Sequence, residues 1–153
     1  MIRYLILAAS LALCFGAAAA PGVAVQVAGG TIVEVPAKTR GRLDLTGGDA
    51  LFLRCDKLEI ELRIDYRKVS TLEYGQNVSR RYAAAFIISP VLLLSKSRRH
   101  FVTLGYLDAD GRQQALVFRV EKGDIRAVLA SLEARTGKRV EYQDNDARKG
   151  SKE

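Results

Sequence analysis

Apolar and polar side chains alternate most regularly between residues 58 and 65 of the chain. Leucine and isoleucine at the even positions from Leu58 to Ile64 are separated by charged residues. This is the period of a strand that has one face in a core and the other in water. Shorter apolar or β-branched stretches, bounded by turn residues, predict further strands at 31–35, 42–45, 50–54, 69–74, 101–107 and 115–120.

The last two of these stretches flank a turn and precede an amphipathic segment. Asp110-Gly111 lies between them and supplies the positive φ that a tight hairpin turn needs. Four apolar residues then fall on one helical stripe: Ile125, Val128, Leu129 and Leu132. The spacing predicts a helix over 124–136, with Asp124 placed to cap its start and Gly137 to end it. The polar residues 143–153 have little to bury and are predicted to form a disordered, charged tail.

A series of strands followed by one C-terminal helix calls for a curved sheet that the helix can cover. Three segments follow in this order: GRLDLTGGDALFL from Gly41, KLEIELRIDYRKVSTLEYG from Lys57 and HFVTLGYLDADGRQQALVFRVEKGDIRAVLASLEARTG from His100. Together they resemble the bacterial pleckstrin-homology-like, or GRAM-type, domains over about residues 41–140. The resemblance implies a mainly β domain at 41–142, a curved sheet or barrel of six to seven antiparallel strands capped by helix 124–136.

Members of this family that grip phosphoinositide head groups use basic residues in and beside the first hairpin loop. In this sequence the first hairpin loop is expected from Thr46 to Ala50, a stretch that holds no basic residue. The resemblance is therefore not expected to extend to the usual inositide site.

The N-terminus carries the features of a secretory signal peptide. Arg3 is followed by an apolar core and then by a series of small residues. The pattern predicts cleavage after Ala18 or Ala19, so that 1–19 are removed and 20–40 form a leader and a first strand. The protein is then exported, to the periplasm or the envelope, although anchoring by an uncleaved N-terminal helix is an alternative.

The remaining chain contains one strongly apolar run, at 82–95, with basic residues on both sides. Its 14 residues fall short of the roughly 20 that a membrane-spanning helix needs, and Pro90 interrupts them. The run predicts an apolar helical insertion at 82–96, which must be covered on all sides. Three alternatives remain for what covers the run: the rest of the domain, a membrane surface, or an interface with a partner or a second copy.

Charge favours an anionic partner for this run. The formal net charge is +7 at pH 7, and an exported protein meets anionic lipid or cell-wall polymer before it meets nucleic acid. An envelope protein is the other expected partner. Each lysine or arginine near an anionic bilayer contributes about 1 kcal/mol of binding free energy. The residues expected to touch the membrane or partner are Arg80, Arg81, Phe86, Ile87, Val91, Leu92, Leu93, Lys96, Arg98 and Arg99.

Residues suited to catalysis are sparse and scattered. His100 is the only histidine and begins a strand inside a basic cluster, which is typical of a strand-end side chain rather than a general base. No Ser-centred elbow, Cys/His metal spacing or Gly-rich phosphate loop occurs in the sequence. Cys55 follows an apolar stretch and is predicted to be a buried, inert thiol. Asp108 and Asp110 fit turn chemistry better than a cation site.

These patterns predict a non-enzymatic, cofactor-free binding module of the cell envelope. It associates with an anionic membrane surface or an envelope partner through the run 82–95 and its basic flanks. One alternative is a structural or self-associating domain, in which the run is buried core or a homo-oligomer interface. A more remote alternative is an unrecognised hydrolase. Nucleic acid is not an expected partner.

Overall fold

The computed structural model describes residues 22–76, 99–143 and 148–149. They form one eight-stranded sheet with the strand order β4-β3-β2-β1-β7-β6-β5-β8, and a helix near the C-terminus. The elements are β1 (Val23–Gly30), β2 (Arg40–Asp44), β3 (Ala50–Cys55), β4 (Ile60–Asp65), η1 (Tyr66–Lys68), β5 (Val69–Gly75), β6 (His100–Leu107), β7 (Gln113–Val120), α3 (Ile125–Thr136) and β8 (Glu141–Tyr142). The expected mainly β chain with one C-terminal helix is confirmed.

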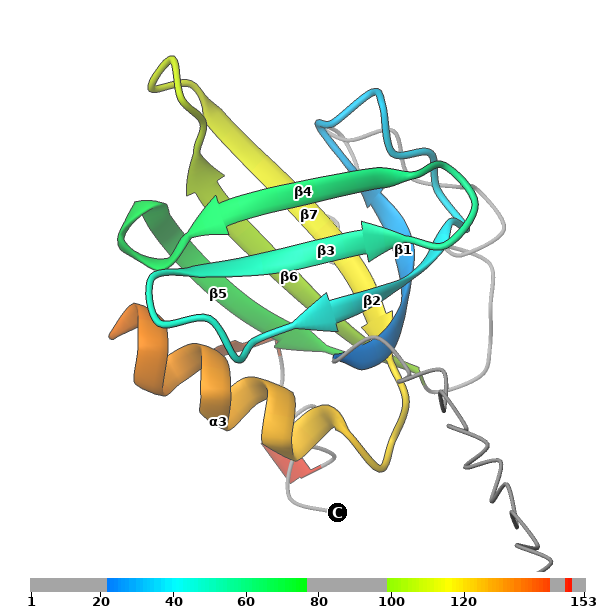
Figure 1. The fold of residues 1–153 in the computed structure, drawn as a ribbon. Helices are drawn as coiled ribbons and strands as arrows, with labels where there is room; N and C mark the ends of the chain where they lie inside the picture. The colour runs from blue at the N-terminus through cyan, green and yellow to red at the C-terminus, as the bar shows by residue number, and fades with distance from the viewer. Residues whose placement is uncertain (1–21, 77–98, 144–147, 150–153) are drawn as a thin grey trace, which may run out of the picture.

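Strand β1 joins the two halves of the sheet. It pairs antiparallel with β2 on one edge and with β7 on the other. A β-bulge between Val27 and Gly29 increases its local bend and twist. Figure 1 shows β2, β3 and β4 in front of β5, β6 and β7, with β1 at the side where the two layers meet. The sheet is therefore folded over on itself, and its inner face encloses the core.

Alternate residues of the strands form this core. Tyr74, Val102 and Phe118 are register partners on β5, β6 and β7, and each is 0% exposed. In the facing layer, Leu43 and Leu53 are register partners and are equally buried. A large apolar side chain contributes about 1.5–3 kcal/mol when it leaves water. Burial on the inner face is thus the main favourable contribution to folding.

The helix α3 closes one end of the folded sheet (Figure 1). The four residues of its predicted apolar stripe all belong to the core cluster. Gly137 ends it with a φ of 68°, and the Gly137 amide donates to the Glu133 carbonyl at 2.9 Å, so the predicted C-terminal cap is confirmed. Asp124 stands at the N-cap position but its side chain makes no capping hydrogen bond. That part of the prediction is wrong, because Asp124 has helical rather than extended backbone angles.

The first strand also differs from the sequence prediction. A strand is predicted at 31–35, whereas the structure places β1 at Val23–Gly30 and residues 31–39 in a loop. The valines of β1 lie between two partner strands, while Val33 is 76% exposed. Pairing on both edges outweighs the β-branched character of the loop. As a consequence, the first hairpin loop is 31–39, and the stretch from Thr46 to Ala50 leads from β2 into β3 instead.

Two smaller differences concern β4 and β8. The alternating pattern begins at Leu58, but Leu58 is 40% exposed and β4 begins only at Ile60. Glu59 between them has a φ of 49°, which the turn from β3 requires. β8 has two residues and pairs in parallel with β5. It is too short to leave a periodic signal in the sequence, and it brings the sheet to eight strands where six to seven are expected.

Two predicted segments lie outside the described residues: the signal peptide 1–19 and the apolar insertion 82–96. In the tail, the Gln143 amide donates to the Tyr74 carbonyl at 3.1 Å, and 144–147 and 150–153 are not described. Within the described ranges, no helix has both the length and the apolar character needed to cross a bilayer.

Candidate anion-binding face

One cross-strand row on the outside of the sheet connects five strands. The row is Gly75, Phe101, Arg119, Gln26 and Arg40, on β5, β6, β7, β1 and β2 in turn. Its members are sequence neighbours of core residues such as Val102 and Phe118, so they lie on the opposite face. Neighbouring strands are about 4.8 Å apart, which lets adjacent side chains of the row interact. The row thus brings two arginines from distant parts of the sequence onto one face.

An open cleft of about 260 Å³ lies over the part of the row formed by β7, β1 and β2. Its polar lining residues are Gln26, Arg40, Asp56, Arg119 and Glu121. Arg119 Nη2 donates to Glu121 Oε1 at 2.8 Å, and Gln26 Nε2 donates to the Lys38 carbonyl at 3.3 Å. These contacts position Arg119 and Gln26, while Arg40 is exposed. The lining thus combines two guanidinium groups, which can bind anionic oxygen atoms, with the carboxylates of Asp56 and Glu121.

Basic residues also gather in and beside the first hairpin loop, 31–39. Lys38 has a φ of 74°, and its amide donates to the Val27 carbonyl at 2.7 Å, which fixes the turn into β2. Arg40 and Arg42 follow on the outer face of β2. The prediction that Thr46 to Ala50 is the first hairpin loop is therefore wrong: that stretch has no basic residue, as stated, but it joins β2 to β3, and the loop between β1 and β2 contains Lys38.

The other end of the row lies where β5 ends and β6 begins. The Tyr74 hydroxyl and His100 Nδ1 share a hydrogen bond of 2.6 Å there, and their rings stack with centroids 6.0 Å apart. Tyr142 on β8 packs edge-on against Tyr74, with ring centroids 6.0 Å apart. His100 begins β6, as the sequence predicts. Its contact with Tyr74, 26 positions away, leaves no pattern that the sequence could reveal.

Most residues predicted to touch a membrane or partner cannot be placed on this face. Nine of them lie outside the described residues: Arg80, Arg81, Phe86, Ile87, Val91, Leu92, Leu93, Lys96 and Arg98. Their role stays a prediction. Arg99 is described, and it is partly buried next to the start of β6. Gly75 and Phe101 are register partners, so the strands that flank residues 77–98 in the sequence end and begin side by side.

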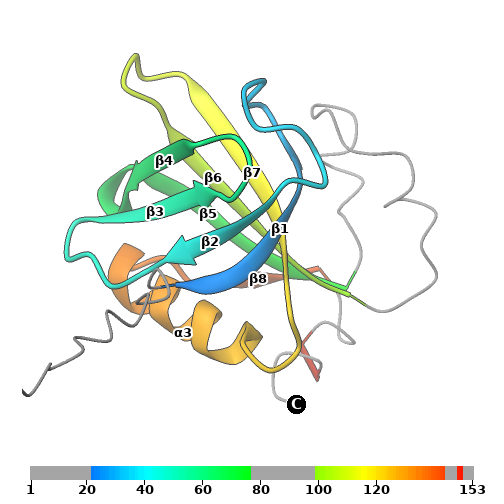
Figure 2. The same cartoon turned by 45° about the vertical axis from the view of Figure 1, so that its right-hand side comes forward.

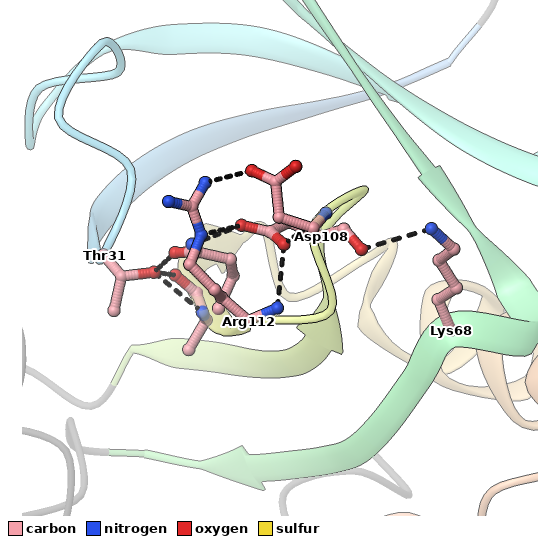
Figure 3. A network of polar contacts seen from close by, with 7 residues as sticks. Thr31, Lys68, Asp108 and Arg112 are labelled. Atoms are coloured by element: carbon pink, nitrogen blue, oxygen red, sulfur yellow. Dashed lines mark hydrogen bonds and ion pairs between the residues drawn. The ribbon is translucent and has the colours of Figure 1, made fainter.

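The acidic residues of the β6–β7 hairpin hold the turn, as predicted. The Asp108 carboxylate accepts hydrogen bonds from the Asp110 and Arg112 amides at 2.9 Å each, and from the Gln114 side chain at 2.9 Å. Figure 3 shows this network, with Arg112 against Asp108 and Lys68 reaching the Asp108 carbonyl. The pKa of Asp108 is lowered to about 2, and the hydrogen bond from the Gln114 side chain makes the largest contribution to this shift. Both carboxylate oxygens of Asp108 therefore accept hydrogen bonds from residues of the same hairpin.

Asp108→Asn is expected to lower the melting temperature at neutral pH, because the amide replaces an acceptor oxygen with a donor and removes the charge that pairs with Arg112. The Asp108 pKa falls from 3.8 to about 2 on folding. Its stabilising contribution is therefore present above about pH 4 and is lost as the pH falls towards 2. The difference in melting temperature between the native chain and the variant, followed by circular dichroism, should shrink over that range. Asp124→Asn is the control, and a difference independent of pH would contradict the assignment.

The structure also describes the cysteine and the potential metal ligands. Cys55 is 4% exposed, and burial raises the pKa of its thiol, so the predicted buried cysteine is confirmed. In the described parts of the chain, no group of three or more His, Cys, Asp or Glu side chains is arranged to hold a metal ion.

Comparison with known proteins gives no family: no protein-family model matches the sequence, and a search of curated proteins finds no relative. The charged outer face of the sheet is therefore the basis of the functional proposal.

Proposed function

We propose that the protein is an exported, non-enzymatic binding module of pleckstrin-homology-like architecture that binds anionic membrane surfaces or partners of the cell envelope. Its contact surface comprises the arginine pair Arg40 and Arg119, with Lys38 and Arg42 beside it. It also comprises the insertion 77–98 with its apolar run and basic flanks. The cross-strand row carries this proposal, because it sets the arginine pair on the same face as Gly75 and Phe101, the paired strand residues on either side of the insertion in the sequence.

The strand order supports the pleckstrin-homology-like part of the proposal. Strands β1 to β4 and β5 to β7 form two antiparallel units, and α3 follows the second unit and packs at one end. The resemblance implies that head-group contacts lie in and beside the first hairpin loop. In this chain that region holds Lys38, Arg40 and Arg42. An anionic head group is thus the ligand chemistry that the resemblance favours, and Arg40 and Arg119 of the cleft supply guanidinium groups for it.

Removal of the arginine pair is expected to weaken binding to anionic vesicles. The chain without residues 1–19 is sedimented with vesicles of phosphatidylcholine alone, and with vesicles that also contain phosphatidylglycerol. Arg40→Ala combined with Arg119→Ala should weaken binding to the anionic vesicles about 30-fold, since each lost contact contributes about 1 kcal/mol. Added salt should weaken the binding of the native chain as well.

A matched pair of substitutions controls for the loss of charge. Arg67→Ala combined with Lys138→Ala removes two charges from exposed positions outside the row, on η1 and after α3, and should change binding little. Arg80→Ala combined with Arg81→Ala tests the predicted flank of the run in the same assay. Equal binding to neutral and anionic vesicles, or equal losses for the cleft pair and the control pair, would overturn the proposal.

A second candidate is a structural or self-associating domain in which the run 82–95 is buried core or an oligomer interface. One observation favours the buried-core form of this candidate: β6 and β7 are buried on both faces within a single chain, with Phe101 3% and Val117 0% exposed. Strands buried on both faces need a cover on the outer side. Sizing chromatography over a range of concentrations distinguishes a buried run from an oligomer interface, because only a self-associating domain changes its apparent size with concentration.

A further inference from the structure

The cleft over β7, β1 and β2 is lined by both signs of charge in equal number. Arg40 and Arg119 supply guanidinium groups, and Asp56 and Glu121 supply carboxylates. A ligand with negative charge alone would face the two carboxylates as well as the two arginines, and like charges brought together oppose binding. A ligand that carries a positive group beside an anionic one is complementary to the whole lining.

Asp56 extends the cross-strand row beyond Arg40. Gly41 and Cys55 are register partners at the end of β3, and the Asp56 amide donates to the Arg40 carbonyl at 3.1 Å. The two residues thus lie next to each other, one strand spacing of about 4.8 Å apart. Both are exposed. Within the described ranges, neither side chain has a hydrogen bond or an ion pair, so a cationic and an anionic group lie side by side and are available to a ligand.

The rest of the cleft has room and donors for the anionic part of a ligand. Arg119 Nη2 is paired with Glu121 Oε1 at 2.8 Å. This contact positions the guanidinium group, which has further N–H donors for phosphate oxygen atoms. Ala24 is exposed and lies two residues from Gln26 on the same face of β1. Its short side chain leaves space over β1 between the charged residues.

We propose that the cleft binds a phosphate group that carries a primary ammonium, the chemistry of a phosphoethanolamine head group. The phosphate lies over β1 between Arg40 and Arg119, and the ammonium donates to the Asp56 carboxylate. Two carbon atoms separate the phosphate ester oxygen from the ammonium, a length comparable to the single strand spacing of about 4.8 Å between Arg40 and Asp56. A choline head group has no N–H to donate to Asp56. This inference deepens the proposed function and rests on it for the phosphate contacts of the arginine pair.

Titration with soluble head groups tests the inference. The chain without residues 1–19 is titrated with glycerophosphoethanolamine, and separately with glycerophosphoglycerol, which has the same phosphate diester but no ammonium. Amide chemical shifts are followed by NMR and should change mainly at residues 24–26, 40–41 and 119–121. We expect glycerophosphoethanolamine to bind about threefold more tightly, because one exposed charge pair distinguishes the two compounds.

Asp56→Asn removes the partner of the ammonium with little change in shape. The variant should bind the two head groups with similar affinity. Asp49→Asn is the matched control, because Asp49 is an exposed aspartate at the opposite end of β3, about 20 Å away along the strand. It should keep the preference of the native chain. Far-UV circular dichroism checks that both variants are folded.

Two further measurements test the phosphate position and the source of the head group. Ala24→Leu retains every charge but fills the space over β1, so it should weaken the binding of both head groups. Phosphatidylethanolamine added to phosphatidylcholine vesicles should increase sedimentation of the native chain but not of Asp56→Asn. A preference seen with the soluble head groups and absent with vesicles supports the ligand chemistry and assigns it to a free head-group compound instead of a lipid.

Equal affinity of the native chain for the two soluble head groups overturns the inference. A preference that survives Asp56→Asn overturns it too, as does the lack of binding to either head group. These outcomes differ from failure of the proposed function, in which loss of Arg40 and Arg119 leaves binding to anionic vesicles unchanged.

Discussion

Phe118→Ala lowers the free energy of unfolding by about 3–5 kcal/mol in urea denaturation followed by circular dichroism. The Phe118 side chain is 0% exposed and belongs to the core cluster. Its register partners are Val102 on β6 and Val27 on β1, so the substitution opens a cavity where the two halves of the sheet meet. A loss of this size is a large part of the 5–15 kcal/mol that stabilise a typical domain.

A second phenylalanine provides the matched control. Phe52 is only partly buried, on the outer face of β3, and the Arg54 guanidinium carbon lies 6.0 Å from the centroid of its ring. Phe52→Ala should therefore cost clearly less than Phe118→Ala. Equal losses at the two positions would contradict a core that lies on the inner face of the folded sheet.

Leu132→Ala is expected to lower the free energy of unfolding by about 2–5 kcal/mol. Leu132 is 0% exposed and lies in the core cluster with the strand residues, so its removal weakens the contact through which α3 closes the sheet. Leu107→Ala makes the same chemical change at a strand end that is 40% exposed and should cost much less. A Leu132→Ala variant as stable as Leu107→Ala would show that α3 is dispensable for the core.

The elements in which apolar residues recur with one helical or strand period over the full length could be predicted from the sequence. The stripe from Ile125 to Leu132 predicts α3 and its core-facing side. The apolar stretches of β6 and β7 predict a hairpin, because Asp-Gly marks the turn between them. β1 could not be predicted in this way. Its sequence, VAVQVAGG, combines valines with small residues, and its strand character comes from partners on both edges.

The candidate site depends on pairings that a single sequence does not display. Gln26, Arg40 and Arg119 become neighbours only when β1 pairs with both β2 and β7. The sequence draws attention instead to the charges around the apolar run, because those are contiguous. The same limit applies to the contact between Tyr74 and His100, which arises from the pairing of β5 with β6.

The central position of β1 also has a consequence for how the chain reaches its fold. Val25 pairs with Gly41 on one side and with Val120 on the other. The first pairing can form soon after synthesis begins, whereas the second must wait until most of the chain has been made. Closing so long a loop slows folding. In that interval one edge of β1 is open to pairing with other chains. The growing polypeptide thus depends on its own late strand, β7, to shield an aggregation-prone edge at its beginning.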